Sequence, residues 1–171
     1  KIEDIKLSLA TFIPGAAQTP GRMNVFEFSK FKVMIDFAHN PMGYRGIEDY
    51  LQSVDASRKI GIISGIGDRR DEDIKECARI GARMFDHIII RQEKYLRGRT
   101  EKEIIDLIIE GIIESDATTT YEVVNLEVDA IRHAISLAKE GTYIVALSDV
   151  VANAIEIVQG YLDEEIENVA G

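Results

Sequence analysis

Short apolar runs alternate along this chain with longer stretches in which apolar residues recur at helical spacing. Such alternation favours parallel strands, because each crossover helix returns the chain to the same end of the sheet. The runs predicted as strands are Lys32–Ile35, Lys59–Ile63, His87–Ile90, Tyr121–Val124 and Thr142–Leu147. The segment Asn24–Phe28 lies close enough to the first run to pair with it as an antiparallel edge hairpin. We therefore expect an α/β fold with an open, mostly parallel sheet and helices on both of its faces.

The helical stretches carry apolar stripes typical of helices that pack one face against a sheet. The stripes are Ile74, Cys77, Ala78, Gly81 and Met84; Ile104, Ile105, Ile108, Ile109 and Ile112; Val128, Ile131, Ala134, Ile135 and Ala138; and Val151, Ile155, Val158 and Leu162. A further helix is expected from near Asn40 to near Val54, with Asn40 as the N-cap and Pro41 at the first helical position. The acidic segment Asp163–Glu167 is expected to fray in solvent.

The N-terminal segment departs from this pattern. Ile2, Ile5 and Leu9 are spaced for a short helix, whereas prolines and glycines interrupt Thr11–Gly21. We interpret residues 1–21 as the end of a preceding central domain and an interdomain linker, and residues 22–171 as one α/β domain. The chain opens without a methionine, as a fragment cut from a longer protein would.

Composition argues against several classes of protein. Apolar residues make up 46% and charged residues 29% of the chain, and no apolar run approaches the ~20 residues of a membrane span. The sequence has one cysteine and no hydrophobic leader, so we expect a cytoplasmic protein without disulfides. The net charge of -10 argues against nucleic acid as a partner, because nucleic-acid binders present a basic face to the phosphates.

Positive charges are nevertheless concentrated in two segments. Arg69 and Arg70 are adjacent, and a second group comprises Arg91, Lys94, Arg97, Arg99 and Lys102. If these segments are loops, they form a local anion site. The alternative is scattered, solvated surface charge.

Ligands of an open parallel sheet bind beyond the carboxyl ends of its strands, where loop amides and helix N-termini converge. The stretches predicted to lie there are Asp36–Pro41, Ser64–Asp71, Arg91–Thr100 and Ser148–Asp149. In the first, Asp36 can accept hydrogen bonds from a ribose or hold a cation, with His39 facing the same ligand. The alternative is a helix-entry turn in which Asp36 and Asn40 only satisfy backbone amides.

The second of these stretches combines glycines with dense charge. Gly65 and Gly67 allow close approach of the backbone, and charged side chains follow them directly. The third glycine and the acidic residue of a dinucleotide fingerprint are missing, so the pattern does not predict NAD binding. Asp71 is expected to cap the next helix.

The third stretch places Arg97 and Arg99 on either side of Gly98. Thr100 is expected to cap the following helix, with Glu103 completing a capping box. The two arginines can grip a carboxylate or a phosphate, or they can pair with acidic residues of the chain itself.

Other constellations that carry chemistry are missing from the sequence. It has no Gly-x-x-x-x-Gly-Lys-[Ser/Thr] phosphate loop, no Cys/His spacing for zinc, and no serine elbow. Cys77 lies on an apolar helix stripe and is expected in the core. His87 and His133 have no partner at ligand spacing, and we interpret them as structural or surface residues.

Four ordered motifs resemble the C-terminal domain of the Mur ligases and folylpolyglutamate synthetases, and above all the cyanophycin synthetase branch of that family. They are Pro20–Asn24, Asp36–Pro41, Gly67–Asp71 and Arg97–Arg99. Phe37 in place of a tyrosine is the one departure within them, and the similarity spans roughly residues 11 to 160. The resemblance implies a Rossmann-like domain of the Mur ligase C-terminal type, within an enzyme that forms homo-oligomers at full length.

By this resemblance, the enzyme is an ATP-dependent amide ligase. ATP phosphorylates a substrate carboxylate, an amino acid attacks the acyl phosphate, and an amide forms with release of ADP and phosphate. In the cyanophycin synthetase branch, arginine is joined to the side-chain carboxylates of poly-aspartate, an acidic polymer. A central P-loop domain holds most of the ATP and the Mg, so the chain alone is expected to be inactive.

The resemblance also implies roles for individual residues. Arg22 is expected to act catalytically by reaching the γ-phosphate when the domains close. Asp36 is expected to bind the ribose, and His39 and Asn40 to line the same ATP-binding loop. The residues expected to position the substrate amino acid are Asp68, Arg69, Arg97 and Arg99. No metal ligand is expected in this chain.

Two alternatives remain open at this point. The chain can belong to another Mur or folylpolyglutamate-type ligase that adds a different amino acid. The missing phosphate loop also allows a non-catalytic module that binds a nucleotide or a polymer.

Overall fold

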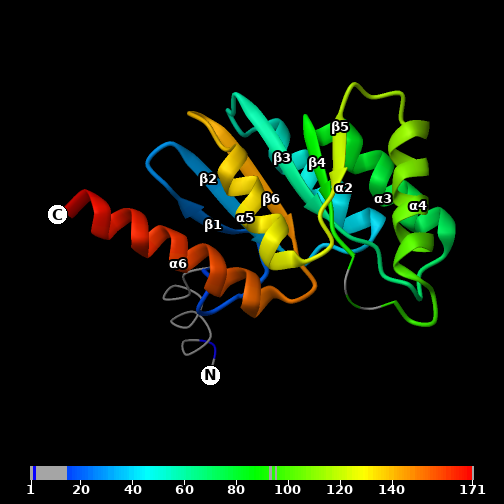
Figure 1. Cartoon of the computed structure of the whole chain (residues 1–171), viewed down its shortest axis with the longest axis horizontal. Coiled ribbons are helices and arrows are strands. Elements are labelled where there is room, and N and C mark those ends of the chain that lie inside the picture. Colours follow the sequence, from blue (N-terminus) through cyan, green and yellow to red (C-terminus); the bar gives the residue numbers. More distant parts are fainter. Residues whose placement is uncertain (1, 3–14, 93, 95, 171) are drawn as a thin grey trace.

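A computed structural model describes residues 2, 15–92, 94 and 96–170, which contain a six-stranded sheet (Figure 1). The strands are β1 (Asn24–Glu27), β2 (Phe31–Asp36), β3 (Arg58–Ile63), β4 (His87–Ile90), β5 (Thr120–Val123) and β6 (Thr142–Leu147), in the spatial order β1-β2-β6-β3-β4-β5. β1 pairs with β2 antiparallel, and the other neighbouring strands pair parallel. The prediction of a mostly parallel sheet with an antiparallel edge hairpin is confirmed, with strand ends shifted by about one residue.

Helices cover both faces of the sheet, as the sequence predicts (Figure 1). They are α2 (Pro41–Gln52), α3 (Asp71–Met84), α4 (Glu101–Glu114), α5 (Glu127–Leu137) and α6 (Val151–Ala170). One core cluster joins α2, α3 and α4 to the sheet, and the second joins α5 and α6 to its other face. The described helices include none that is long and apolar enough to cross a membrane.

The central strands are buried on both faces, which explains their nearly continuous apolar sequence. Every residue of β4 and β6 is buried. Ile88 and Ile90 of β4 face the cluster of α2, α3 and α4, whereas Ile89 faces that of α5 and α6. The edge strand β5 is different, because its residues are exposed or half-buried.

Capping side chains set the starts of two helices as predicted. Asn40 precedes α2 and its Oδ1 accepts a hydrogen bond from the Gly43 amide at 2.9 Å, with Pro41 at the first position. Thr100 and Glu103 form the capping box of α4. The prediction for α3 was wrong, because Asp71 is its first residue and Arg70 precedes it without a side-chain cap. An acidic residue in that position is stabilised by the helix dipole.

The acidic segment near the C-terminus is helical, so the prediction that it frays was wrong. α6 continues through Asp163–Glu167 to Ala170. Glu165 accepts hydrogen bonds at 2.9 Å from both the amide and the hydroxyl of Ser29, in the turn between β1 and β2. These contacts hold the end of α6 against the edge hairpin.

The predicted N-terminal helix and most of the predicted linker lie outside the described residues. Ile5, Leu9 and positions 11–14 belong to that part of the chain. Of the remainder, Gly15 and Thr19 close a turn in which the Thr19 amide donates to the Gly15 carbonyl at 2.7 Å. The domain boundary at residue 21 stays a prediction.

Close packing of α3 against α4 requires a glycine at position 111. A Cβ at Gly111 would lie 2.4 Å from the carbonyl oxygen of Lys75 and 2.8 Å from the Cβ of Ala78. The two helices would have to move apart to admit a methyl group. Gly160 on α6 is different, because a Cβ added there would have no neighbouring atom within 4 Å.

We therefore predict opposite effects of the same substitution at these two glycines. Gly111→Ala should lower the free energy of unfolding by about 1–3 kcal/mol, because it overpacks the helix contact. Gly160→Ala should raise it by about 0.5–1 kcal/mol, because alanine is the better helix former. Urea unfolding followed by circular dichroism measures both values. Equal effects of the two substitutions would contradict this account of the contact.

Candidate functional site at the carboxyl edge of the sheet

All four predicted loop stretches lie at the carboxyl edge of the sheet. β6 pairs in register with β2 on one side and with β3 on the other, so Asp36 lies beside Leu147, and Ala146 lies beside Ile62. Ile63 of β3 is in turn paired with Ile90 of β4. The loops that follow these strands therefore meet at one edge, where a parallel sheet binds its ligands.

Asp36 is buried and already engaged by backbone amides. Its Oδ1 accepts from the Ala38 amide at 2.7 Å, and its Oδ2 accepts from the Met23 amide at 2.9 Å. These bonds fasten the loop after β2 to the turn before β1. Asp36 therefore satisfies backbone amides, which was the alternative that the sequence left open. A hydrogen bond from a ribose would use the remaining lone pairs of the carboxylate.

Arg22 lies on the tight turn before β1 and its side chain is exposed. Its Nη1 donates to the Gly21 carbonyl at 3.0 Å, and its Cζ lies 5.8 Å from the centre of the Phe37 ring. Gly21 has φ of +70°, and a Cβ there would lie 2.7 Å from Val151. A glycine is therefore needed for the turn that presents Arg22 at this edge.

Phe37 also joins Arg22 to His39. The Phe37 and His39 rings lie 4.7 Å apart, and His39 Nδ1 lies 2.9 Å from the Phe37 carbonyl oxygen. The structure thus gathers Arg22, Asp36 and His39, which the sequence singled out, around the loop that follows β2.

A pocket of about 120 Å³ opens between the loops that follow β2 and β3. It is lined by His39, Asn40, Pro41, Ser64, Gly65, Ile66, Arg69, Asp73, Ile74 and Cys77. Three of the predicted site residues, His39, Asn40 and Arg69, are among them. Asp73, in the first turn of α3, was not singled out from the sequence.

Arg99 ties the loop after β4 to the loop after β3. Its Nε donates to the Gly67 carbonyl at 2.8 Å, its Nη2 donates to the Arg69 carbonyl at 3.0 Å, and its Nη1 lies 2.6 Å from Asp71 Oδ1. Pairing with an acidic residue of the chain was one of the alternatives for this arginine. The contacts make it a positioning residue for the backbone of Arg69.

The two loops approach so closely that position 67 must be a glycine. A Cβ at Gly67 would lie 1.8 Å from the Leu96 carbonyl oxygen. Asp68 and Arg97 are exposed on these two loops, and neither lines the pocket. Arg97 has φ of 49° and precedes Gly98 with φ of 92°, so the loop turns sharply there.

Arg91 is buried, so the interpretation that it contributes to an open anion site was wrong. Its side chain is 1% exposed and pairs with Asp149 and with Glu127, whose carboxylate oxygen lies 3.3 Å away. Ser148 donates its hydroxyl to the same Glu127. This cluster fastens the end of β4 to the end of β6 and the start of α5. The partners are distant in sequence, so their pairing was not visible from the sequence.

His87 and His133 both contact the carboxylate of Glu122, away from this edge. Their Nε2 atoms each lie 2.8 Å from Glu122 Oε1. The hydrogen bond from His87, and then that from His133, lowers the pKa of Glu122. In the described part of the chain, no group of three or more His, Cys, Asp or Glu side chains is suited to hold a metal ion. The contacts join β4, β5 and α5, which agrees with a structural role.

Comparisons with known proteins agree with this architecture. Residues 21–150 match the family model described as Mur ligase, glutamate ligase domain. A cyanophycin synthetase from Synechocystis sp. is 37% identical over 158 residues, which is 92% of this chain and 18% of that protein. The chain therefore spans less than a fifth of the length of this relative.

Solved structures show the same fold. A UDP-N-acetylmuramoyl-L-alanyl-D-glutamate--2,6-diaminopimelate ligase matches with a TM-score of 0.70 and 16% identity, over 96% of this chain and 35% of that one. E. coli FolC in complex with ADP matches with a TM-score of 0.64 and 20% identity, over 84% of this chain and 32% of that one. At these identities the likeness concerns the fold.

Cys77, which lines the pocket, should be chemically inert in the folded chain. Its side chain is buried, which raises the pKa of the thiol to about 12. At pH 8 the thiol should therefore stay protonated and react with Ellman's reagent only after unfolding, when its pKa falls to about 8.5. Absorbance at 412 nm, with and without urea, measures the two rates. Equal rates in the folded and unfolded chain would contradict the burial of this thiol.

Proposed function

Because the chain belongs to the Mur ligase family as a glutamate ligase domain, we propose that it is the C-terminal domain of an ATP-dependent amide ligase of the cyanophycin synthetase type. The observation that carries the proposal is the 37% identity to a cyanophycin synthetase over 92% of the chain. That stretch is long enough to include the loops at the carboxyl edge of the sheet. We also propose that residues 1–21 connect this domain to a preceding one.

The proposed reaction has two steps. A carboxylate oxygen of the acceptor polymer attacks the γ-phosphorus of ATP, and ADP leaves. The amine of an amino acid, arginine by family resemblance, then attacks the carbonyl carbon of the acyl phosphate, and phosphate leaves as the amide forms. The acceptor by the same resemblance is poly-aspartate. Bound Mg supplies charge neutralisation at the phosphates, and a domain outside this chain would hold most of it together with the nucleotide.

On the nucleotide side, we assign Arg22 to the γ-phosphate and Asp36 to the ribose. The exposure of Arg22 on a tight turn supports the first assignment, because the guanidinium can rotate away from Phe37 without unpacking the core. The position of Asp36 at the strand end supports the second. His39 and Asn40 lie on the same loop and complete this side.

On the amino-acid side, we assign Arg69 to the carboxylate of the incoming amino acid. It lines the pocket between the loops, and an arginine can bind a carboxylate through two parallel hydrogen bonds. Arg99 holds the carbonyl of Arg69 and so fixes its backbone. Asp68 and Arg97 are proposed contacts for the polymer, because both are exposed on the loops that Arg99 joins.

The proposed function is tested with the complete gene product that carries this chain. Poly-aspartate, ATP and each amino acid in turn are supplied, and ADP release and polymer mass are measured. We expect ADP release and a mass increase that depend on arginine. Dependence on another amino acid would point to a different ligase of the family. A gene product that uses no ATP with any amino acid would overturn the proposal in favour of a binding module.

Replacing Arg22 in the complete gene product should abolish most of its activity. Arg22→Ala should lower kcat by about 10³-fold or more, as the loss of an arginine that stabilises phosphoryl transfer does. Arg83→Ala is the matched control, because Arg83 is an exposed arginine at the opposite end of α3, paired with Glu48 at 3.1 Å. Near-normal turnover of the Arg22 variant would remove its assigned role.

A further inference from the structure

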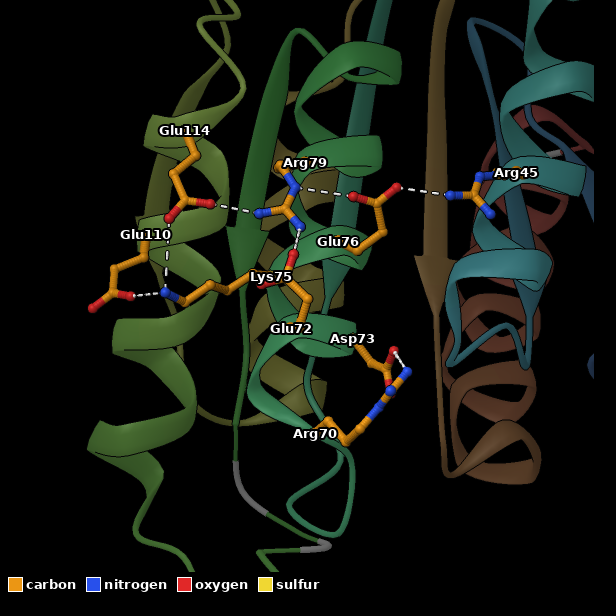
Figure 2. A network of polar contacts seen from close by, with 9 residues as sticks. All are labelled: Arg45, Arg70, Glu72, Asp73, Lys75, Glu76, Arg79, Glu110 and Glu114. Atoms are coloured by element: carbon orange, nitrogen blue, oxygen red, sulfur yellow. Dashed lines mark hydrogen bonds and ion pairs between the residues drawn. The ribbon is translucent and has the colours of Figure 1, made fainter.

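The first turn of α3 holds an arginine on a carboxylate in a two-pronged contact. Arg70 Nε donates to Asp73 Oδ2 and Arg70 Nη2 donates to Asp73 Oδ1, each at 2.8 Å (Figure 2). This is the planar geometry in which a guanidinium is recognised most selectively. The contact within the chain thus shows that a guanidinium fits against the carboxylate of Asp73.

The two partners of this contact differ in exposure. The side chain of Arg70 is 82% exposed, whereas that of Asp73 is 27% exposed and lines the pocket. An exposed ion pair of this kind contributes little to stability, so Arg70 can leave it at small cost. The carboxylate of Asp73 would then stay at the pocket wall.

The rest of the pocket suits a long side chain with a planar cationic end. Ile66, Ile74 and Cys77 supply apolar surface, against which the methylene groups of such a side chain can pack. The pocket measures about 120 Å³. An apolar cavity of ~150 Å³ is known to admit benzene, and a guanidinium is smaller than benzene.

The pocket also carries opposite charges on its wall. Arg69 and Asp73 both line it, one a cation and the other an anion. An amino acid with a cationic side chain has a carboxylate for the first and a cation for the second. This charge pattern matches such a ligand better than an amino acid with an apolar or acidic side chain.

We propose that Asp73 selects an incoming amino acid with a guanidinium side chain, and that Arg70 occupies this position until the amino acid displaces it. The inference rests on the proposed function, for which it names the residue that determines specificity. A lysine ammonium cannot reproduce the two parallel hydrogen bonds, and the neutral citrulline lacks the charge.

The test is a titration of the isotope-labelled chain with free L-arginine, L-lysine and L-citrulline, followed by NMR of its backbone amides. We expect arginine to shift the amide signals of Ser64, Gly65 and Ile66, which line the pocket. Lysine and citrulline should bind at least about tenfold more weakly, because each loses part of a charge-assisted contact. Equal binding of citrulline and arginine would overturn the proposal.

Two variants should change the affinity for arginine in opposite directions. Asp73→Asn should weaken binding at least about tenfold, because the charge-assisted bonds are lost. Arg70→Met should tighten it about two- to fivefold, because the competing guanidinium is removed from an exposed pair. A structural role for the pair would make both variants weaken binding, and that result would overturn the proposal.

Asp129→Asn is the matched control. Asp129 pairs with Arg132 at 3.2 Å, three residues away on a helix, in a second exposed pair outside the pocket. This variant should bind arginine as the unchanged chain does. Amide spectra of all variants show whether the fold is intact, because signals away from the substituted position should not move.

The same variants separate this inference from the proposed function. If Asp73 governs arginine binding but the complete gene product forms no amide, the ligase proposal fails and the guanidinium site stands. If the gene product forms amides and its Asp73→Asn variant keeps the original preference for arginine over lysine, the ligase stands and the role of Asp73 is wrong.

Discussion

Parallel pairing of β6 with both β2 and β3 is the constraint on which the carboxyl edge depends. The six residues of β6 are buried, and burying one large aliphatic side chain contributes about 1.5–3 kcal/mol. β6 is the last strand in the sequence, yet in the sheet it lies between β2 and β3. Its insertion fixes the distance between the loops after β2 and β3, and the pocket is lined by those two loops and by the N-terminal turns of the helices that follow them. The pocket therefore requires that the C-terminal part of the domain be folded.

Electrostatic pairing then sets the shape of this edge. Although the chain has a net charge of -10, several arginines lie at the edge, and two of them are paired with acidic residues. Arg91, which directly follows β4, is paired with Asp149, and Arg99 is paired with Asp71 at the start of α3. These two cations connect elements of the domain through ion pairs, so the exposed positive charge at the edge is smaller than the sequence suggests. Such ion pairs keep the backbone of the loops in place, and a preorganised site loses less entropy when it binds a ligand.

The sequence predicts those features that depend on neighbouring residues. The strands, the Asn40 cap and the Thr100 capping box follow from local patterns and were found. The residues of the predicted helix stripes are buried or half-buried, except Val128, which is exposed. The errors at Asp163–Glu167 and at Arg91 concern contacts between distant residues, whereas the error at Asp71 is a shift of one position at a helix start. Glu165 bonds to Ser29, 136 positions away, and so stabilises a segment whose composition suggested fraying. Arg91 and Asp149 are 58 positions apart, and the burial of Arg91 depends on that partner. The sequence does not single out Asp73, because the helix dipole alone explains an acidic residue in the first turn of a helix.

Comparison with a second arginine on α3 explains why Arg70 can be exchanged for a ligand. Arg79 is 19% exposed and contacts Glu72, Glu76 and Glu114, so it joins α3 to α4 (Figure 2). Displacing it would break its ion pairs with three carboxylates, among them the pair with Glu114 that joins α3 to α4. Arg70 precedes the helix, is 82% exposed, and contacts a carboxylate only three residues away. A ligand that replaces Arg70 therefore disturbs no contact between elements, and the same two hydrogen bonds re-form with the ligand as donor. Exchange of one guanidinium for another is then governed mainly by the added contacts that the ligand makes inside the pocket.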